Sequence, residues 1–286
     1  MVSIRDSLSF AQKVLSSANI SEAVIEAELI WMHVLNVSRH DLYLNNFPNV
    51  TDLNVKRVHE ILSERLTGKP LAYVLGLWKA YDVDLIISPD VLIPRPESEI
   101  LIERGIEICR SGVFGKSPVV VDVGTGSGSI AINLIRNVPN IQLFATDNSK
   151  RALEIAQQNF KRFGLYERIT SLHGDLLEPI FVLPDLVIAN LPYIPSRNID
   201  WLQEEVRWEP REALDGGNDG LACFRKIAVE SKSKLNNCRG VFLLEMDPPQ
   251  IEDVVSMFRT EHPKVEFDVI RDLRGLERVL EITIGM

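Results

Sequence analysis

Cysteine is scarce in this sequence. Its 286 residues include three cysteines, Cys109, Cys223 and Cys238, which lie far apart in the chain. They form no CxxC pair and no Cys/His cluster, which are the usual sequence signs of a zinc site or a disulfide framework. We therefore expect no metal site, and we expect reduced thiols, as in a cytoplasmic protein.

Long apolar runs and a basic excess are also missing. No segment is apolar over the length that a transmembrane helix needs, and the stretch MVSIRDSLSF has no cleavage-site pattern. The 31 Lys and Arg residues are outnumbered by 40 Asp and Glu residues, so the net charge is −9. Proteins that bind long stretches of nucleic acid through phosphates usually carry a basic excess. We therefore expect a cytoplasmic protein with no membrane partner and no extensive nucleic-acid binding.

Apolar residues, in contrast, make up 45% of the chain, which is enough for a sizeable core. At this length we expect one large domain or two smaller ones. Residues 1–75 have the pattern of consecutive helices. In SEAVIEAELIWMHVLN, Ser21 can cap a helix in which Ile25, Leu29 and Met32 share one face. The sequence thus predicts a small all-α bundle as the first domain.

Strand patterns begin after this helical stretch. The alternating segment YDVDLIIS predicts a short β-hairpin in a linker over residues 76–93. Residues 94–286 then alternate strands with helices, which is typical of an α/β fold with a mostly parallel sheet covered on both faces. Seven segments have strand character: PVVVDV, IQLFATD, RITSLH, PDLVIAN, RGVFLLEM, VEFDVIRD and ERVLEITI. Only the four residues LRGL separate the last two, so they should pair as a C-terminal antiparallel hairpin.

The first of these strands ends in a glycine turn, VVVDVGTGSG. Glycines at 124, 126 and 128 let the backbone turn tightly and approach a ligand, and the following helix presents free N–H groups. Asp147 ends the second strand, 23 residues after Gly124, where a carboxylate can accept both hydroxyls of a ribose. Together they indicate a nucleoside cofactor. The spacing is GxGxG rather than GxGxxG, which argues against a nicotinamide oxidoreductase.

The stretch with Asp122 before the turn resembles motif I of the Rossmann-like S-adenosylmethionine methyltransferases. The resemblance implies a class I methyltransferase domain over residues 94–286. In that family the glycine loop lies beside the methionine part of the donor, the acidic residue binds the ribose, and a residue after the third strand lies near the adenine. The implied S-adenosylmethionine contacts are Gly124, Thr125, Gly126, Ser127, Gly128, Asp147, Asp175, Leu176 and Asn190.

A polar corner, Asn-Leu-Pro-Tyr, follows the fourth strand in DLVIANLPYIP. Asn190 offers a carbonyl acceptor, the Leu191 carbonyl is made rigid by Pro192, and Tyr193 offers a flat face. Two acceptors that bind the hydrogens of a planar –NH₂ group can orient its nitrogen for attack on a methyl group. We therefore predict Asn190 and Tyr193 as catalytic, and all four residues as the substrate-binding corner.

This corner resembles the N-P-P-Y motif of amino methyltransferases, with Leu191 in place of the first proline. Those enzymes act on adenine or on glutamine side chains, and N-L-P-Y itself occurs in ribosomal-RNA adenine dimethylases. The tetrapeptide therefore leaves an adenine amino-methyltransferase of RNA or DNA open as an alternative. A folded protein that binds the cofactor without catalysis is a further alternative, which the departure at Leu191 favours.

Other stretches of the chain help to choose between adenine and glutamine as the substrate. VLIPRPESEIL, with Ser98 for the usual threonine, and EPREALDGGNDGL resemble signatures of the HemK/PrmC family. GKPLAYVLG and DLRGLERVL match further family stretches, while Asp247 in LLEMDPPQ departs from the usual glycine. This resemblance implies a helical domain that docks a peptide-chain release factor, and a catalytic domain that methylates the glutamine of its Gly-Gly-Gln motif.

Four charged residues in these stretches have two possible roles. Arg95 and Glu97 could shape the pocket beside the corner or form a structural ion pair. The same two alternatives apply to Glu209 and Arg211.

Overall fold

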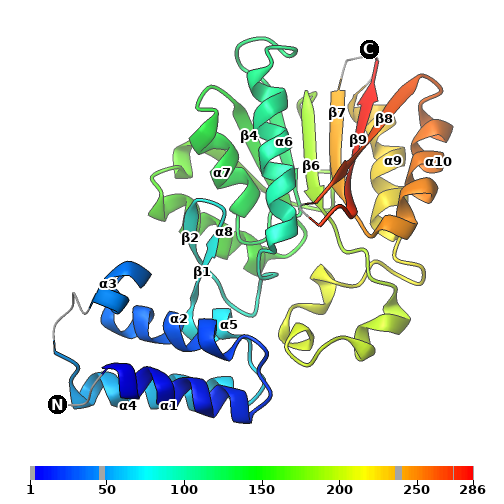
Figure 1. Ribbon diagram of the computed structural model, residues 1–286. Helices are drawn as coiled ribbons and strands as arrows, with labels where there is room; N and C mark the ends of the chain where they lie inside the picture. Colours follow the sequence, from blue (N-terminus) through cyan, green and yellow to red (C-terminus); the bar gives the residue numbers. More distant parts are fainter. Residues whose placement is uncertain (1–3, 45–48, 236–239, 273, 286) are drawn as a thin grey trace. The chain divides into compact units, whose positions relative to one another are not determined.

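The computed structural model describes residues 4–44, 49–235, 240–272 and 274–285, so Cys238 lies outside the described residues. The chain divides into two compact units (Figure 1). The first unit is Met1–Leu77 together with Glu204–Trp208. The second unit is Trp78–Gln203 together with Glu209–Met286. Among the described residues, no helix combines the length and apolar character needed to cross a membrane.

Helices build the first unit. Their bounds are α1 Ile4–Ser17, α2 Ala23–Leu35, α3 Arg39–Leu44, α4 Asp52–Arg65 and α5 Leu71–Leu75. A capping box begins α4: the Thr51 hydroxyl accepts from the Asn54 amide at 3.2 Å, and the Asn54 side chain accepts from the Thr51 amide at 2.9 Å. The core between the helices includes Leu15, Ile30 and Trp31, all fully buried. This confirms the predicted helical N-terminal domain.

The apolar face predicted for α2 is only partly the face that is buried. Ile25 is 47% exposed, and Leu29 and Met32 are only half-buried. The buried apolar side chains of α2 are Ala23, Ala27, Ile30 and Trp31. Ser21 does not cap the helix, which begins at Ala23 after Glu22 without a side-chain cap. Since α2 is apolar around most of its circumference, its periodicity alone does not select one face.

Two sheets lie in the rest of the chain. Strands β1 Leu77–Ala80 and β2 Val83–Ile86 form a two-stranded sheet. The large sheet has seven strands in the order β5-β4-β3-β6-β7-β9-β8. Its strands are β3 Val119–Val123, β4 Gln142–Asp147, β5 Ile169–His173, β6 Leu186–Asn190, β7 Gly240–Glu245, β8 Val265–Arg271 and β9 Glu277–Ile284. Strands β3 to β7 are parallel, and β9 is antiparallel to both β7 and β8. The predicted α/β sheet with its C-terminal antiparallel hairpin is therefore confirmed.

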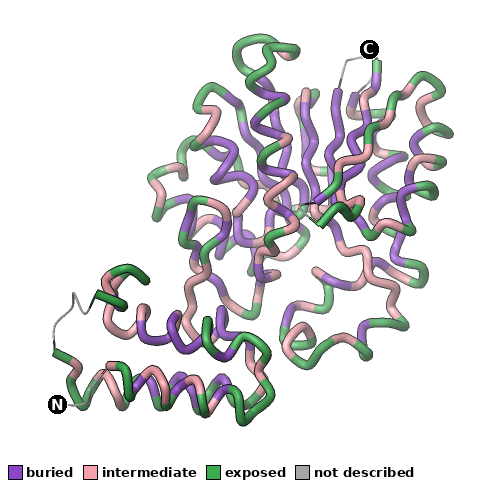
Figure 2. Tube along the Cα trace, viewed as in Figure 1, coloured by how far each residue is buried: buried purple, intermediate pink, exposed green. Residues whose placement is uncertain are grey.

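Helices cover both faces of this sheet (Figure 1). They are α6 Glu99–Arg110, α7 Ser129–Asn137, α8 Lys150–Arg162, α9 Ala222–Lys234 and α10 Ile251–Glu261. The short 3₁₀ turns are η1 Pro96–Ser98, η2 Tyr166–Arg168, η3 Ser196–Trp201, η4 Val206–Trp208, η5 Arg211–Ala213 and η6 Pro248–Gln250. Helix α6 approaches the sheet closely at Gly105, where a Cβ would lie 2.7 Å from Ile188 and 2.9 Å from Leu134 of α7. The strands are the most deeply buried part of this unit (Figure 2).

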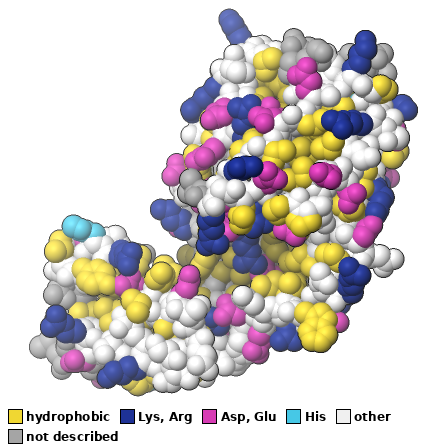
Figure 3. Space-filling model, turned by 45° about the vertical axis from the view of Figure 1, so that its right-hand side comes forward, with side chains coloured by type: hydrophobic (Ala, Val, Ile, Leu, Met, Phe, Trp, Pro, Cys, Tyr) yellow, Lys and Arg dark blue, Asp and Glu magenta, His cyan; other side chains and the backbone are white. Residues whose placement is uncertain are grey.

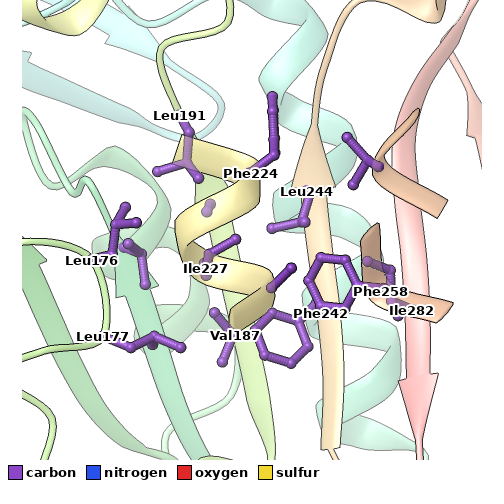
Figure 4. Packing of buried hydrophobic residues seen from close by; sticks show 14 of the residues in the cluster. Leu176, Leu177, Val187, Leu191, Phe224, Ile227, Phe242, Leu244, Phe258 and Ile282 are labelled. Atoms are coloured by element: carbon purple, nitrogen blue, oxygen red, sulfur yellow. The ribbon is translucent and has the colours of Figure 1, made fainter. Parts of the chain in front are cut away.

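The main core lies between the sheet and helices α9 and α10 (Figure 4). Phe242 of β7 and Phe258 of α10 meet edge to face with ring centroids 5.3 Å apart. Val187 of β6 and Phe224 of α9 belong to the same cluster, and both are fully buried. Alternate strand residues point to this side, whereas Ile188 points to α6, as expected for a sheet buried on both faces.

The strand order places the candidate site. Strands β3 and β6 are neighbours, and they lie where the order reverses along the sheet, as predicted. Their register pairs Val123 with Ala189 at the carboxyl ends. Gly124, which follows β3, and Asn190, the last residue of β6, therefore lie side by side at the edge where ligands of open α/β sheets bind.

Candidate active site

The glycine turn after β3 has a backbone that favours glycine. The φ angles of Gly124, Gly126 and Gly128 are +70°, +55° and +83°. At Gly128 a Cβ would lie 2.6 Å from a ring carbon of Phe160, so a side chain there would be both strained and obstructed. The amides of Gly124 and Thr125 both donate to the Thr146 carbonyl at 2.9 Å, which ties the turn to β4.

Asp122 stabilises this turn from inside the protein. Its side chain is fully buried, and one oxygen accepts from the Thr125 hydroxyl at 2.7 Å and from the Ala131 amide at 3.2 Å. Burial raises its pKa to about 7, although both hydrogen bonds favour the charged form. Asp122 thus holds the turn against the start of α7.

Asp147 is oriented by two backbone amides. One carboxylate oxygen accepts from Gly126 and the other from Ser149, both at 2.9 Å. Ser149 also caps α8, as its hydroxyl accepts from the Ala152 amide at 3.3 Å. Each oxygen of Asp147 keeps lone-pair capacity for another donor, so the fixed carboxylate can bind two neighbouring hydroxyls. Burial raises the pKa of this carboxyl group.

A cavity in the second unit brings most of the predicted site residues together. The predicted residues that line it are Gly124, Thr125, Gly126, Ser127, Asp147, Asp175, Leu176, Asn190, Leu191 and Pro192. Gly128 and Tyr193 are not among its described lining residues. Apolar walls come from Ile102 and Ile130. Within the described part of the chain, no group of three His, Cys, Asp or Glu side chains is placed to hold a metal ion.

The glycine turn and the corner after β6 lie against each other in this cavity. A Cβ built on Gly124 would be 3.8 Å from the Asn190 carbonyl oxygen and 3.7 Å from the Leu191 side chain. Leu191 is only 3% exposed and packs into the main core (Figure 4). The residue that replaces proline in the corner therefore anchors it to the hydrophobic interior.

Asn190 also has a fixed side chain. Its amide nitrogen donates to the hydroxyl oxygen of Ser98 at 2.9 Å, and Ser98 is itself 9% exposed. The Ser98 hydroxyl group also favours the charged form of Glu245, which is the register partner of Asn190 on β7. Ser98 stands in the PRPESE motif, but no local pattern predicts its contact with Asn190 or marks Glu245.

A loop rich in glycine supports the other half of the corner. The Ile194 amide donates to Leu214 at 3.0 Å, and the Gly216 amide donates back to Ile194 at 2.9 Å. The Gln250 side chain donates to the Tyr193 carbonyl at 2.9 Å. A Cβ at Gly220 would lie 2.2 Å from the same carbonyl oxygen. The DGGNDG stretch therefore packs directly against the corner, which explains why it needs glycine.

Tyr193 is packed rather than free. Its ring lies against the main core, and burial together with the nearby Glu245 raises its pKa to about 12. The phenol is therefore neutral near pH 7 and is not a proton acceptor there.

The stretch after β5 closes another side of the cavity. Asp175 forms an ion pair with Lys226 of α9, and Leu176 has a φ of +46°. The Thr146 hydroxyl donates to the Leu176 carbonyl at 3.0 Å, which stabilises this unusual backbone.

The four charged residues pair differently from the sequence pattern. Arg95 forms an ion pair with Glu209 rather than with Glu97, and Glu209 also accepts from the Ile93 amide at 3.1 Å. Arg211 pairs with Asp215 at 3.2 Å. Arg95 still lines the cavity, so the ion pair orients a pocket residue.

Other lining residues were not predicted, and they include Tyr81, Glu212 of η5 and Cys223 of α9. No local pattern marks them, because they come from separate segments that only the fold brings together. On the face shown in Figure 3, basic and acidic side chains are interspersed.

Comparison with known proteins places the chain in a family. Residues 6–76 match the PrmC N-terminal domain, and residues 108–209 match the methyltransferase small domain. The release factor glutamine methyltransferase of Dictyoglomus turgidum is 33% identical over 98% of both chains. The protein of the same name from Geobacter sulfurreducens is 33% identical over 99% of this chain and 97% of its own.

Among solved structures, the hMettl16 catalytic domain in complex with an MAT2A 3′UTR hairpin has a TM-score of 0.56. It is 16% identical and covers 84% of this chain and 86% of that one, so the likeness concerns the fold. The full-length relatives decide the family predicted from the sequence motifs: this chain belongs to the release factor glutamine methyltransferases.

Proposed function

We propose that this protein transfers a methyl group from S-adenosylmethionine to a glutamine side-chain amide in peptide-chain release factors, within their Gly-Gly-Gln motif. Family membership supports the reaction and the partner. The single observation that carries the site is the contact between the Gly124 turn and the Asn190 corner in one cavity. Because these two segments are in contact, a methyl group on a cofactor bound at the turn can reach a substrate nitrogen bound at the corner.

The cavity has the features that a nucleoside sulfonium needs. Two backbone amides orient the Asp147 carboxylate and leave lone pairs free to accept from a ligand. The neighbouring turn carries glycines, so a ligand can approach its backbone closely. Ile102, Ile130 and Leu176 supply apolar wall. When bound, S-adenosylmethionine supplies a methyl group on a positively charged sulfur that leaves as a neutral thioether. We assign to its binding Gly124, Thr125, Gly126, Ser127, Gly128, Asp147, Asp175, Leu176 and Asn190.

The corner after β6 is assigned to the glutamine. An amide nitrogen is a poor nucleophile because its lone pair is delocalised into the carbonyl group. The Asn190 side-chain oxygen and the Leu191 carbonyl accept the hydrogens of that nitrogen, which orients it and favours the pyramidal geometry of attack. As the carbon–nitrogen bond forms and the carbon–sulfur bond breaks, the nitrogen loses one of these protons to solvent. Pro192 makes the corner rigid, and the neutral ring of Tyr193 supplies a flat contact for the substrate.

Docking of the release factor is assigned to the helical domain, over residues 1–75. Residues 76–93 would link it to the methyltransferase domain over residues 94–286. We place the protein in the cytoplasm, because its proposed partner acts on ribosomes there.

Mass spectrometry of the release factor tests this function. After incubation with the protein and S-adenosylmethionine, the peptide that contains Gly-Gly-Gln should gain one methyl group on glutamine. A release factor with alanine in place of that glutamine is the control and should stay unmodified. A parallel reaction offers ribosomal RNA with a labelled methyl donor, and label on RNA alone would contradict the proposal.

A further inference from the structure

We propose that Ser98 and Glu245 are positioning residues that determine which end of the Asn190 side-chain amide faces the cavity. This inference rests on the proposed function, in which Asn190 must present its oxygen to the substrate amide. It assigns a role to a serine and a buried glutamate for which the proposed function names no contact with S-adenosylmethionine or glutamine.

The side chains of Asn190, Ser98 and Glu245 lie together and can form a continuous chain of hydrogen bonds. Asn190 and Glu245 are register partners on the parallel strands β6 and β7, so their side chains lie side by side. Ser98, in η1 just before α6, accepts from the Asn190 amide nitrogen at 2.9 Å, and its hydroxyl group favours the charged form of Glu245. Ser98 is 9% exposed and Glu245 is 2% exposed, so water does not replace these partners easily.

The direction of this chain follows from the charge on Glu245. An ionised carboxylate only accepts hydrogen bonds, so Ser98 gives its proton to Glu245. The Ser98 oxygen is then left as an acceptor, and only the nitrogen end of the Asn190 amide can donate to it. The oxygen of Asn190 is consequently turned away from Ser98, toward the cavity that Asn190 lines.

A proton on Glu245 would permit the opposite direction. The carboxylic acid can donate to Ser98, Ser98 can donate to the Asn190 oxygen, and the Asn190 nitrogen then faces the cavity. In that state the N–H groups of Asn190 face the N–H groups of the substrate amide. Two sets of hydrogen-bond donors cannot pair, so the substrate amide does not bind productively. Turnover should therefore be highest when Glu245 is ionised and should fall as Glu245 takes up a proton.

The surroundings of Glu245 bring this change close to neutral pH. Burial raises its pKa to about 7, and its Oε2 atom has no hydrogen-bond partner among the described residues. Arg278 of β9 and Arg95 favour the charged form, whereas Glu97 opposes it. Tyr193 also faces this carboxylate and is neutral here. The charged, active form accordingly predominates above pH 7 and is lost as the pH falls through 7.

Three variants test the proposal by steady-state kinetics on release factor between pH 6 and 9. Ser98→Ala should lower kcat about tenfold or more, with S-adenosylmethionine affinity unchanged, because only the orientation of Asn190 is lost. Ser98→Thr keeps the hydroxyl group and should restore kcat. Glu245→Gln should lower kcat at pH 8 and flatten the fall of kcat toward pH 6.

Two comparisons make the result decisive. Glu281→Gln alters another buried strand carboxylate, one that pairs with Arg104 and does not line the cavity, so its pH profile should match the wild type. Asp122 also has a pKa near 7, and a fall that persists in Glu245→Gln would point to it and overturn the proton-dependent step.

The failure of this inference differs from the failure of the proposed function. Wild-type protein that methylates the release factor, with Ser98→Ala equally active, overturns the positioning role alone. Wild-type protein without transfer to the release factor overturns the function itself. If Ser98→Ala does not fold, the Ser98→Thr and Glu245→Gln profiles still decide, since a wild-type profile in Glu245→Gln contradicts the inference.

Discussion

At the scale of single residues, the site depends on polar atoms whose orientation is fixed before any ligand binds. Asp147 is held by two amides and Asn190 by Ser98, so neither side chain has to reorganise on binding. Leu191 shows how a departure from the family motif is accommodated: its side chain is buried in the core while its backbone stays at the corner.

Asn190→Ala should separate catalysis from donor binding. The variant loses the acceptor that orients the substrate nitrogen, and turnover should fall by about 10²-fold or more, as for loss of a positioning group. Affinity for S-adenosylmethionine should stay nearly unchanged, as measured by calorimetry. Asn198→Ala, in η3 and not among the residues that line the cavity, is the control. Turnover equal to the wild type would remove Asn190 from its assigned role.

Asp147→Ala should instead weaken donor binding. The carboxylate is the proposed acceptor for the ribose hydroxyls, and a hydrogen bond to a charged group is worth about 1.5–3 kcal/mol, or roughly ten- to a hundredfold in Kd. Titration calorimetry with S-adenosylmethionine measures this change. Asp268→Ala, an exposed carboxylate on β8, should bind as the wild type does. Equal affinity in Asp147→Ala and the wild type would contradict the ribose contact.

At the scale of elements, the corner after β6 is shaped by a second loop that follows it by some twenty residues. Backbone hydrogen bonds between Ile194 and residues 214–216 align the two segments, and Gln250 of η6 binds both the Tyr193 and the Gly220 carbonyls. The loop therefore fixes the shape of the corner, and its glycines allow the two backbones to pack closely.

Gly220→Ala tests this packing against a matched control. Gly220 and Gly115 have nearly the same φ, +79° and +80°, so alanine costs similar backbone strain at both, of order 1–2 kcal/mol. At Gly115 a Cβ meets no described atom within 4 Å, whereas at Gly220 it meets the Tyr193 carbonyl at 2.2 Å. Only Gly220→Ala should also lower kcat, because the corner must shift. Equal kcat in the two variants would show that the loop does not shape the corner.

At the scale of the whole molecule, each of the two units is built from two separate stretches of the sequence. Glu204–Trp208 belongs with the N-terminal helices, although its neighbours on both sides belong to the second unit. Arg65 of α4 explains this assignment: it is 2% exposed and forms ion pairs with Glu26 of α2 and with Glu205. The helical unit thus depends on a segment far from it in the sequence.

Arg65→Ala should destabilise the helical unit strongly. The change leaves Glu26 buried without its cation, and breaking a buried pair typically costs about 3–5 kcal/mol. Arg57→Ala is the control, because its pair with Glu60 is exposed and worth at most about 1 kcal/mol. Hydrogen exchange of α2 and α4, followed by mass spectrometry, measures both. Similar exchange in the two variants would contradict the importance of this cluster.

The amino-acid sequence by itself determined the order of helices and strands, the antiparallel hairpin, the glycine turn and the residues of the corner. These features are local, since periodicity, turn chemistry and short motifs act between neighbours in the chain. The resemblance to the family could also be recognised from the sequence, because each family motif is a short local stretch and the motifs follow one another in the family's order.

Only the tertiary structure decided the partners of these residues. Glu245 lies beside Asn190 because the strand order brings β7 next to β6. Ser98 contacts Asn190, and Arg95 pairs with Glu209, across about a hundred residues of sequence. Likewise, α2 buries Ala27 and Ile30 rather than Ile25, because its neighbours in the bundle select one of several apolar faces. Such pairings join residues many positions apart, and no local pattern encodes which distant segments will pack together.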